Sequence, residues 1–397
     1  MKKTSVWITI GLYLVSSIVS YMVFSNSEKI SSRSTATQSG STPLGDETAL
    51  GALLEIDPSE PKDQVCPLNG AYYTQTEKNA WEKRRPLAVM IENAPDARPH
   101  SGLSSADVVY EIVAEGGVTR FMALYYCGAQ RFDVTVAPVR SARTYFLDYA
   151  SGYNFPLYAH VGGANTPGPA DALGQISDYG WSLQNDLNQF SIGYPTFVRN
   201  ANRLNRPVAT EHTMESTTEL LWGVGEEREW TNMSPARRIG RLTYEPEDWK
   251  EGFEPWVYQD EVPAPGTVTS ISHDFWSGYE QYRVKWDYNS ETNTYARTMG
   301  GEAHVDLNTD EQISASNVIV ILTEEKGPID EVKHMLYATT GTGDALLFKN
   351  GQAIEATWVK KDRMDELTFV DKKGDDIEFV RGATWIAVVD TSTEVTY

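Results

Sequence analysis

Residues 137–144 read Ala-Pro-Val-Arg-Ser-Ala-Arg-Thr and link a strand predicted over 132–139 to a helix predicted to begin at 143. The first backbone N–H groups of a helix lack partners within the helix and carry a partial positive charge. Arg140 and Arg143 add guanidinium groups, which grip phosphate or carboxylate through paired hydrogen bonds, and Ser141 adds a hydroxyl. The segment therefore predicts an anion-binding site. The alternative is that both arginines are solvated, or that one pairs with a nearby glutamate.

A second loop of similar design follows His160. Residues 156–161 form an apolar run that predicts a strand, and Gly162 and Gly163 open a glycine-rich loop. If this strand runs parallel to the one before the arginine segment, both loops leave one edge of a sheet, where ligands of open α/β sheets bind. His160 could then be a general base or a ligand contact, or a structural histidine. The loop lacks the spacing of a nucleotide-binding P-loop.

Further acid–base candidates lie near two other turns. Glu115 precedes the Gly116-Gly117 turn and Arg120 follows it, so this carboxylate could do acid–base work or form a structural ion pair. His212, beside Glu211, is a candidate ligand contact. The chain contains neither a G-x-S-x-G nucleophile elbow nor an H-E-x-x-H motif. We predict neither a metal site nor a cofactor.

The elements that must position these side chains form two predicted domains. Residues 71–235 alternate apolar runs with helix-like segments, which predicts an α/β domain. Residues 236–397 contain short alternating strands and an Asn350-Gly351 hairpin signal, which predicts a mostly antiparallel β domain. The expected fold class is therefore α+β or α/β, with both domains following an N-terminal membrane helix.

The N-terminus carries the signals of an exported, anchored chain. Lys2 and Lys3 precede an uncharged apolar run over 6–24, close to the ~20 residues that span a bilayer. Because a positive flank stays in the cytoplasm, we expect residues 1–24 to anchor a body on the extracytoplasmic side of the cell membrane. Residues 25–70, too polar to bury a core, are the expected linker. A cleaved signal peptide is the alternative.

Charge composition limits the class of partner. The chain has 34 basic and 55 acidic residues and a net charge of −21. Such a surface repels a phosphate backbone, which argues against broad nucleic-acid binding and leaves room for a local basic pocket.

The two cysteines, Cys66 and Cys127, are expected to form a disulfide. Their number is even, and an exported chain enters an oxidising compartment. The bond would join the entrance of the first domain to a core strand. The alternative is a pair of unrelated thiols.

Several long strings resemble the YerB-like lipoprotein family of bacteria. They are RPLAVMIEN from Arg85, ADVVYEIVAEGGVTRFMALY from Ala106, PVRSAR from Pro138, HVGG from His160, GGEAHVDLNTDEQISASNVIV from Gly300 and LLFKNGQAIEATWVK from Leu346. The resemblance covers roughly residues 82–390 and implies an envelope protein with two linked domains of unknown function. It brings no reaction and no catalytic residues. The chain departs from the family name because no cysteine for lipid attachment follows the apolar run, and TEHTMES, around His212, matches loosely.

We therefore expect a membrane-anchored extracytoplasmic protein that binds an anionic ligand, such as a phosphate- or carboxylate-bearing cell-wall component. One alternative is a hydrolase of an envelope polymer, with Glu115 or His160 as acid–base and the arginines stabilising charge. Another is a scaffold that binds an envelope protein through the aromatic-rich second domain. A cleft that brings Glu115, Arg120, Arg140 and His160 together favours the ligand-binding and hydrolase hypotheses. A flat apolar patch on the second domain favours the scaffold hypothesis.

Overall fold

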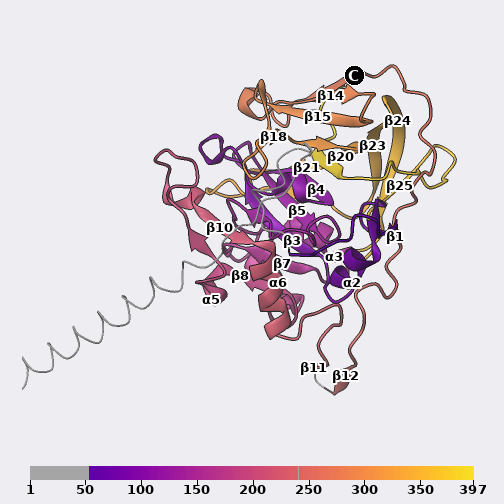
Figure 1. The fold of residues 1–397 in the computed structure, drawn as a ribbon. Helices are drawn as coiled ribbons and strands as arrows, with labels where there is room; N and C mark the ends of the chain where they lie inside the picture. Colours follow the sequence, from indigo (N-terminus) through magenta and orange to yellow (C-terminus); the bar gives the residue numbers. More distant parts are fainter. Residues whose placement is uncertain (1–52, 240) are drawn as a thin grey trace, which may run out of the picture. The chain divides into compact units, whose positions relative to one another are not determined.

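The computed structural model describes residues 53–239 and 241–397. Their secondary structure is mostly β, with few helices (Figure 1). The expected anchor over residues 1–24 lies outside the described residues, as does most of the expected linker. Of the helices in the described part, none has both the length and the apolar character needed to cross a membrane.

Ten strands form the largest sheet. In spatial order they are β25 (Thr368–Val370), β24 (Gln352–Lys360), β23 (Gly341–Lys349), β20 (Asn317–Thr323), β26 (Thr384–Asp390), β4 (Val108–Glu115), β5 (Val118–Tyr125), β3 (Leu87–Glu92), β7 (Leu157–His160) and β8 (Asp186–Asn188). Strands β20, β26, β4, β3, β7 and β8 all run in the same direction. Their carboxyl ends therefore lie along one side of the sheet, here called the carboxyl edge.

Strands from both predicted domains share this sheet. β26 pairs in parallel with β4, in a register that runs from Thr384 opposite Val108 to Val388 opposite Ile112. The central strands are nearly continuous apolar runs, as expected for strands that are covered on both faces. The pairing of β26 with β4 thus joins the two halves of the sequence at the centre of the sheet.

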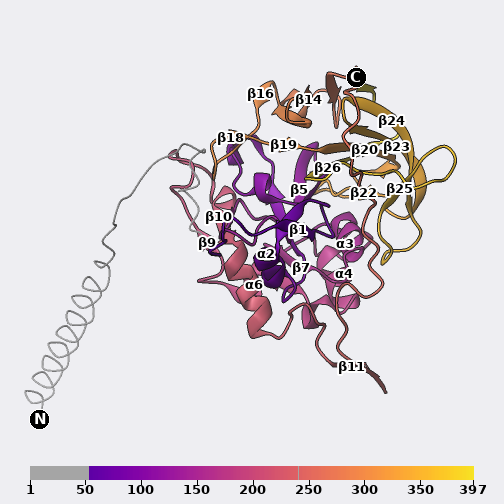
Figure 2. The same ribbon diagram turned by 45° about the vertical axis from the view of Figure 1, so that its right-hand side comes forward.

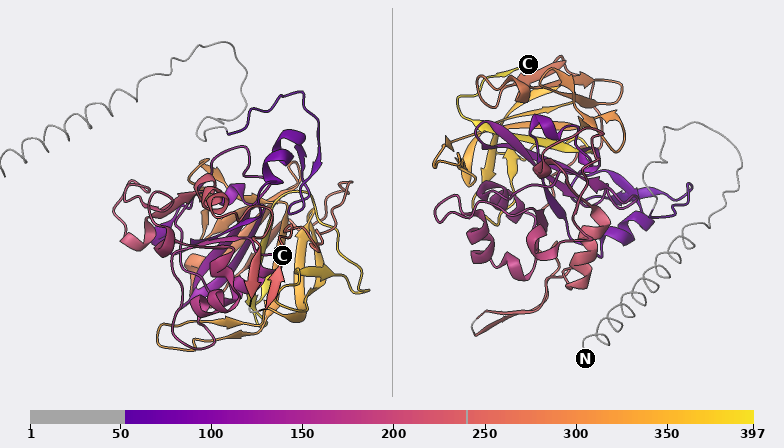
Figure 3. Two further views of the ribbon diagram at one scale, coloured as in Figure 1. Left: turned by 90° about the horizontal axis from the view of Figure 1, so that it is seen from below. Right: turned by 90° about the vertical axis from the view of Figure 1, so that its left-hand side faces the viewer.

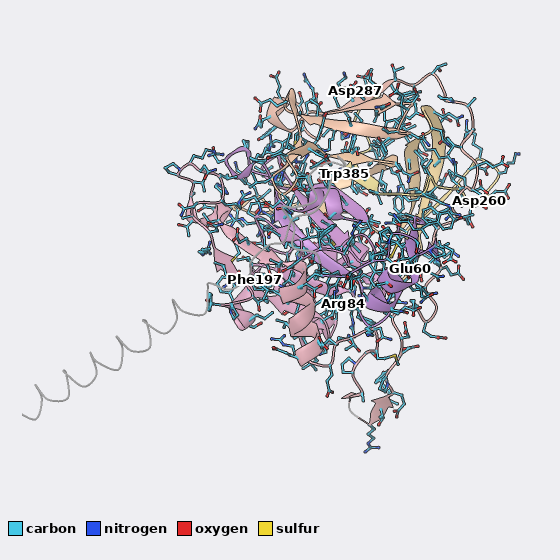
Figure 4. All side chains as sticks on the ribbon, viewed as in Figure 1. Glu60, Arg84, Phe197, Asp260, Asp287 and Trp385 are labelled. Atoms are coloured by element: carbon cyan, nitrogen blue, oxygen red, sulfur yellow. A yellow bond between two sulfur atoms is a disulfide. The ribbon has the colours of Figure 1, made fainter. Side chains whose placement is uncertain are left out.

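A second, six-stranded sheet forms another layer (Figure 3). It contains β16 (Glu302–Ala303), β15 (Thr294–Met299), β14 (Val284–Asn289), β13 (Ser270–His273) and β27 (Val395–Thr396), with β19 (Ser314–Ala315) paired to β15. Trp286 of this sheet meets Trp385 of β26 with ring centroids 5.5 Å apart. Trp385 lies in the interior, only 2% exposed (Figure 4). The Asn350-Gly351 hairpin is confirmed, and it joins β23 to β24 with a positive φ at both turn residues.

The helices are short. They are α2 (Gln75–Trp81), α3 (Thr144–Ser151), α4 (Ala172–Asp178), α5 (Gln189–Ile192) and α6 (Thr218–Glu227). Tyr149 of α3 stacks on Tyr110 of β4 with centroids 5.0 Å apart, which fixes α3 against the sheet. α6 contacts β3 and β7.

The strand expected over residues 132–139 is wrong in extent. Only β6 (Thr135–Val136) forms, and it pairs with β10 (Met214–Thr217) in a three-stranded sheet completed by β9 (Val198–Arg199). Pro138 has no N–H group to donate to a strand ladder, which explains the early end.

The remaining strands make small two-stranded sheets: β1 (Lys62–Val65) with β2 (Tyr72–Thr74), β11 (Arg237–Ile239) with β12 (Leu242–Tyr244), β17 (Val305–Asp306) with β18 (Glu311–Gln312), and β21 (Glu325–Lys326) with β22 (Leu336–Tyr337). Figure 2 shows β11 projecting from the body.

The structure contains the disulfide between Cys66 and Cys127, whose Cα atoms are 6.0 Å apart. It fastens the first described segment to the end of β5. The buried Asp107 holds the adjoining turn, because its carboxylate accepts hydrogen bonds from the backbone N–H groups of Tyr126 (2.6 Å) and Cys127 (3.1 Å). Covalent and polar links thus fix the same corner of the domain.

Candidate functional site

The arginine loop and the glycine-rich loop meet at the carboxyl edge. The N–H of Val161 donates to the carbonyl of Arg140 (3.0 Å), and the N–H of Ala142 donates to the carbonyl of Gly162 (2.9 Å). Beside these loops, β3 ends at Glu92 and β4 ends at Glu115. The parallel direction of the strands therefore gathers candidate side chains that are distant in sequence.

Glu115 lies between two buried arginines. Arg143 donates a hydrogen bond to its Oε1, and Nη2 of Arg120 lies 3.3 Å from the same oxygen. Burial tends to raise the pKa of Glu115, but the charges of Arg120 and Arg143 outweigh it and lower that pKa to about 2. A β-bulge between Val113 and Glu115 turns the end of β4, so a local irregularity positions this carboxylate.

The two arginines also bind the backbone of the loop. Arg120 Nη1 donates to the carbonyl of Ser141 (3.1 Å), and Arg143 Nη1 donates to the carbonyl of Ala142 (2.6 Å). Arg120 is 3% exposed and Arg143 is 6% exposed. For Arg143 the alternative of pairing with a nearby glutamate is the one that the structure shows, because this N-cap residue turns its side chain inward to Glu115.

Arg140 belongs to a different group, centred on Glu92. Its Nε lies 3.2 Å from Glu92 Oε1, and His212 Nδ1 lies 2.8 Å from Glu92 Oε2. Because a carboxylate only accepts, Nδ1 of His212 carries the proton, and Nε2 is an acceptor when the ring is neutral. The Arg140 side chain is 29% exposed and that of His212 is 11% exposed. Arg140 is thus the most accessible of the three arginines.

Glu92 was missed as a site residue by sequence reasoning. It is 4% exposed and lies opposite Arg120 in the pairing of β3 with β5, so it links the Arg140 group to the Glu115 group. The available signal was an acidic residue at the end of the apolar run 86–91. Three guanidinium groups therefore surround two carboxylates at this part of the edge, in a chain whose overall charge is strongly negative.

His160 has a supporting position. Its ring is fully buried, with Nδ1 2.7 Å from the carbonyl oxygen of Gly162 and Nε2 2.6 Å from Asp186 Oδ1. Both partners accept hydrogen bonds, so the ring is held from both sides and cannot reach a ligand. The residue fixes the glycine-rich loop against β8.

The glycines of this loop allow close packing. Gly162 has a φ of +59°, and a Cβ there would lie 2.9 Å from the Phe190 ring. A Cβ on Gly163 would lie 3.0 Å from Leu173 and 3.3 Å from Ala142. The backbone of the two loops can therefore approach only because these side chains are absent.

A second ionic network lies deeper, between the two sheets, and sequence reasoning missed it. Arg297 of β15 donates to Glu111 Oε2 of β4 (2.5 Å), and neither side chain is exposed. Arg297 also donates to His304 Nδ1 (2.5 Å), so the Nε2–H of His304 donates to His100 Nδ1 (2.8 Å). The only signal was an acidic residue inside the apolar run of β4. Its complete burial makes it a link between the layers, with no access for a ligand.

The described residues do not provide a cluster of side chains that could bind a metal ion. In residues 53–239 and 241–397, no three side chains from His, Cys, Asp and Glu are placed to hold one metal ion.

Comparison with known proteins identifies two matching family models. Residues 73–230 match the N-terminal domain, and residues 273–386 the C-terminal domain, of a protein of unknown function, DUF3048. The chain is 27% identical over 334 residues to YerB of Bacillus subtilis (strain 168), described as a candidate lipoprotein, covering 84% of this chain and 88% of YerB. A crystal structure of B. subtilis YerB superposes with a TM-score of 0.66 and 25% identity, covering 84% of this chain and 100% of that one.

Proposed function

We propose a function for this chain, which belongs to the YerB-like family of two-domain proteins of unknown function. It is a membrane-anchored envelope protein that binds an anionic ligand through Arg140. The ligand carries a phosphate or carboxylate group, as cell-wall polymers do. Glu92 orients the guanidinium group, and His212 lies beside it. The observation that carries the proposal is the accessible position of Arg140 within a cluster of three arginines.

Arg140 has the donors that such a ligand needs. Its Nε lies 3.2 Å from Glu92 Oε1 as an ion pair without hydrogen-bond geometry, and within the described part of the chain neither Nη atom forms a hydrogen bond to another residue. A guanidinium group that is held on one side by a carboxylate presents its outer side as a rigid fork for a second anion. Arg120 and Arg143 add positive potential from below, although Glu115 and backbone carbonyls occupy their own donors.

His212 adds a second contact beside Arg140. Because Glu92 fixes its Nδ1–H, the Nε2 atom is directed away from that carboxylate. A neutral ring accepts a hydrogen bond from a ligand hydroxyl or a protonated phosphate, and a charged ring donates to an anion. The pair of Arg140 and His212 therefore suits a phosphate monoester or a carboxylate that carries a nearby hydroxyl.

The geometry gives less support to a hydrolase that uses Glu115 or His160. A carboxylate whose pKa is about 2 remains ionised and does not donate a proton near neutral pH. His160 is buried with both nitrogens occupied. The scaffold alternative relied on aromatic residues of the second half, but Trp286, Trp358 and Trp385 are each at most 2% exposed and belong to the core.

Placement at the envelope is supported by the relative's description as a candidate lipoprotein and by the apolar run at residues 6–24. Because no cysteine for lipid attachment stands directly after that run, the proposed anchor is the apolar run itself. Protease added to intact protoplasts should digest the body, and full protection of the body would contradict this topology.

Ligand binding can be followed at His212 itself. In NMR spectra that report imidazole nitrogens, inorganic phosphate should shift the ring resonances of His212 and leave those of the buried His160 unchanged. Equal shifts at both rings, or none at His212, would count against the site.

A further inference from the structure

A cleft of about 790 Å³ opens at the other end of the carboxyl edge. Its walls come from residues 272–277, which include the end of β13, from Glu325 of β21, and from residues 390–396, which run from the end of β26 into β27. β20 and β26 are parallel neighbours that place Thr323 opposite Asp390, so both strands end beside the cleft. Crevices at the ends of parallel strands are common ligand sites, and this volume suits a small ligand.

The cleft is strongly acidic. Four carboxylates line it, those of Asp274, Glu325, Asp390 and Glu394. Its one arginine, Arg283, donates through Nε and Nη2 to both oxygens of Asp274 (2.8 and 3.0 Å), which neutralises that charge locally. His273 adds no charge near neutral pH, because burial, followed by the nearby Arg297, lowers its pKa to about 4. The remaining negative charge repels anions and attracts cations.

An indole ring lies in a fixed position among these acids. Trp276 is half-buried and donates through Nε1 to Glu325 Oε1 (2.7 Å), while Tyr337 donates to Glu325 Oε2 (2.5 Å). Both oxygens of Glu325 are therefore engaged, and its role is to hold the aromatic wall. An aromatic ring next to carboxylates is the combination that recognises an organic ammonium group.

Two carboxylates remain for direct contact with a cation. Asp390 Oδ1 accepts from the backbone N–H (2.9 Å) and the hydroxyl (2.6 Å) of Ser392. The Asp390 carboxylate also accepts hydrogen bonds from the backbone N–H groups of Glu325 and Thr391, so it is partly satisfied and Glu394 is the freer of the two acids. Glu394 is exposed and, among the described residues, has no hydrogen-bond or ion-pair partner. No three acidic or histidine side chains of the described part converge on one point, which favours an organic cation over a metal ion.

We propose that this cleft binds the side-chain ammonium group of a lysine-type residue in a peptide. Glu394 and Asp390 contact the ammonium group, and the alkyl stem lies against Trp276, since such side chains combine an apolar stem with a charged tip. The site is separate from Arg140 and independent of the function proposed above.

Calorimetry on the purified full-length chain tests the assignment with Nα-acetyl-lysine amide as the ligand. Nα-acetyl-norleucine amide has the same stem without the charge, glucosamine carries its amine on a sugar, and calcium chloride supplies an inorganic cation. The key variant is Glu394→Gln, matched by Asp344→Asn, which removes one exposed carboxylate from β23 outside the cleft. Trp276→Leu removes the aromatic wall.

The lysine amide should bind, and the norleucine amide should not. Glu394→Gln should weaken binding about tenfold, the size of one charge-assisted hydrogen bond, while Asp344→Asn and Arg140→Ala leave it unchanged. Trp276→Leu should weaken binding as well. The melting temperature of this variant is measured first, so that a loss of binding is not confused with a loss of folding. Equal binding of both amides, preference for glucosamine, binding of calcium alone, or equal effects of Glu394→Gln and Asp344→Asn would each overturn the assignment.

Discussion

The guanidinium group of Arg143 donates a hydrogen bond to the carboxylate of Glu115, 28 residues earlier in the chain. This bond ties the start of α3 to the end of β4. Arg120 reaches the same oxygen from β5. Arg143, which the sequence predicted as a ligand contact, therefore helps to hold the carboxyl edge together, and Arg140 remains as the proposed ligand contact.

Replacing Arg143 with Ala should lower the free energy of unfolding. Removing one partner of a buried ion pair costs about 3–5 kcal/mol, and the 30% exposure of the Glu115 side chain reduces the expected loss to about 2–3 kcal/mol. Urea denaturation followed by circular dichroism measures this. Arg140→Ala is the matched control and should cost less than Arg143→Ala, because Arg140 is partly exposed and His212 still donates to the Glu92 carboxylate. Equal losses in both variants would show that Arg140 is structural too.

The stabilisation from Glu115 should depend on pH. Its pKa in the folded chain is about 2, below the ordinary value of 4.5. The ionised group therefore stabilises the fold fully above about pH 5, and this contribution is lost as the pH falls towards about 2. The stability difference between the wild-type chain and Glu115→Gln should shrink over that range. A difference that stays constant from about pH 6 to about pH 3 would mean that the carboxylate is not ion-paired.

Loss of the disulfide should destabilise the domain. Cys66 and Cys127 are 61 positions apart, and a cross-link over a loop of that length contributes about 2–4 kcal/mol. The Cys66→Ser/Cys127→Ser variant should therefore unfold at lower urea concentration than the oxidised chain. Mass spectrometry of unreduced and reduced protein is the accompanying check, since detection of two free thiols in the mature chain would remove the premise.

The buried pair of Glu111 and Arg297 should show strong coupling. Arg297→Met leaves the Glu111 carboxylate without its cationic partner and should cost about 3–5 kcal/mol. Adding Glu111→Leu removes that stranded charge and should restore part of the loss. A double-mutant cycle by chemical denaturation gives the coupling energy. Strictly additive losses would indicate that the two side chains do not interact.

Local patterns predicted much of the fold. The apolar run 156–161 contains β7, and the apolar run 86–91 covers β3 except for its last residue, Glu92. α3 starts beside Arg143, and the Asn350-Gly351 turn joins β23 to β24. Each of these features depends on neighbouring residues, through apolar runs, N-cap position or turn chemistry. The extent predicted for β6 was wrong because the apolar run continues past Pro138, whereas strand pairing cannot use a residue that lacks an N–H group.

Features that depend on long-range pairing could not be predicted in the same way. Nothing local indicates that β26 pairs with β4, or that Arg297 meets Glu111, since these partners lie 186 or more positions apart in the chain. Within the candidate site, residue types suggested Arg140 and His212, but only the fold shows that Glu92 holds both. Burial separates Arg143 and His160 from Arg140, and a short motif carries little information about burial.

The most direct test of the anion site is a calorimetric titration of inorganic phosphate into the wild-type chain, Arg140→Ala and Arg241→Ala. Arg241 is an exposed arginine in the loop between β11 and β12, so its loss changes net charge equally without touching the site. The account predicts binding by the wild type and Arg241→Ala, and weakening by about tenfold or more in Arg140→Ala, because a hydrogen bond to a charged group contributes about 1.5–3 kcal/mol. Equal affinity in Arg140→Ala and Arg241→Ala would contradict it.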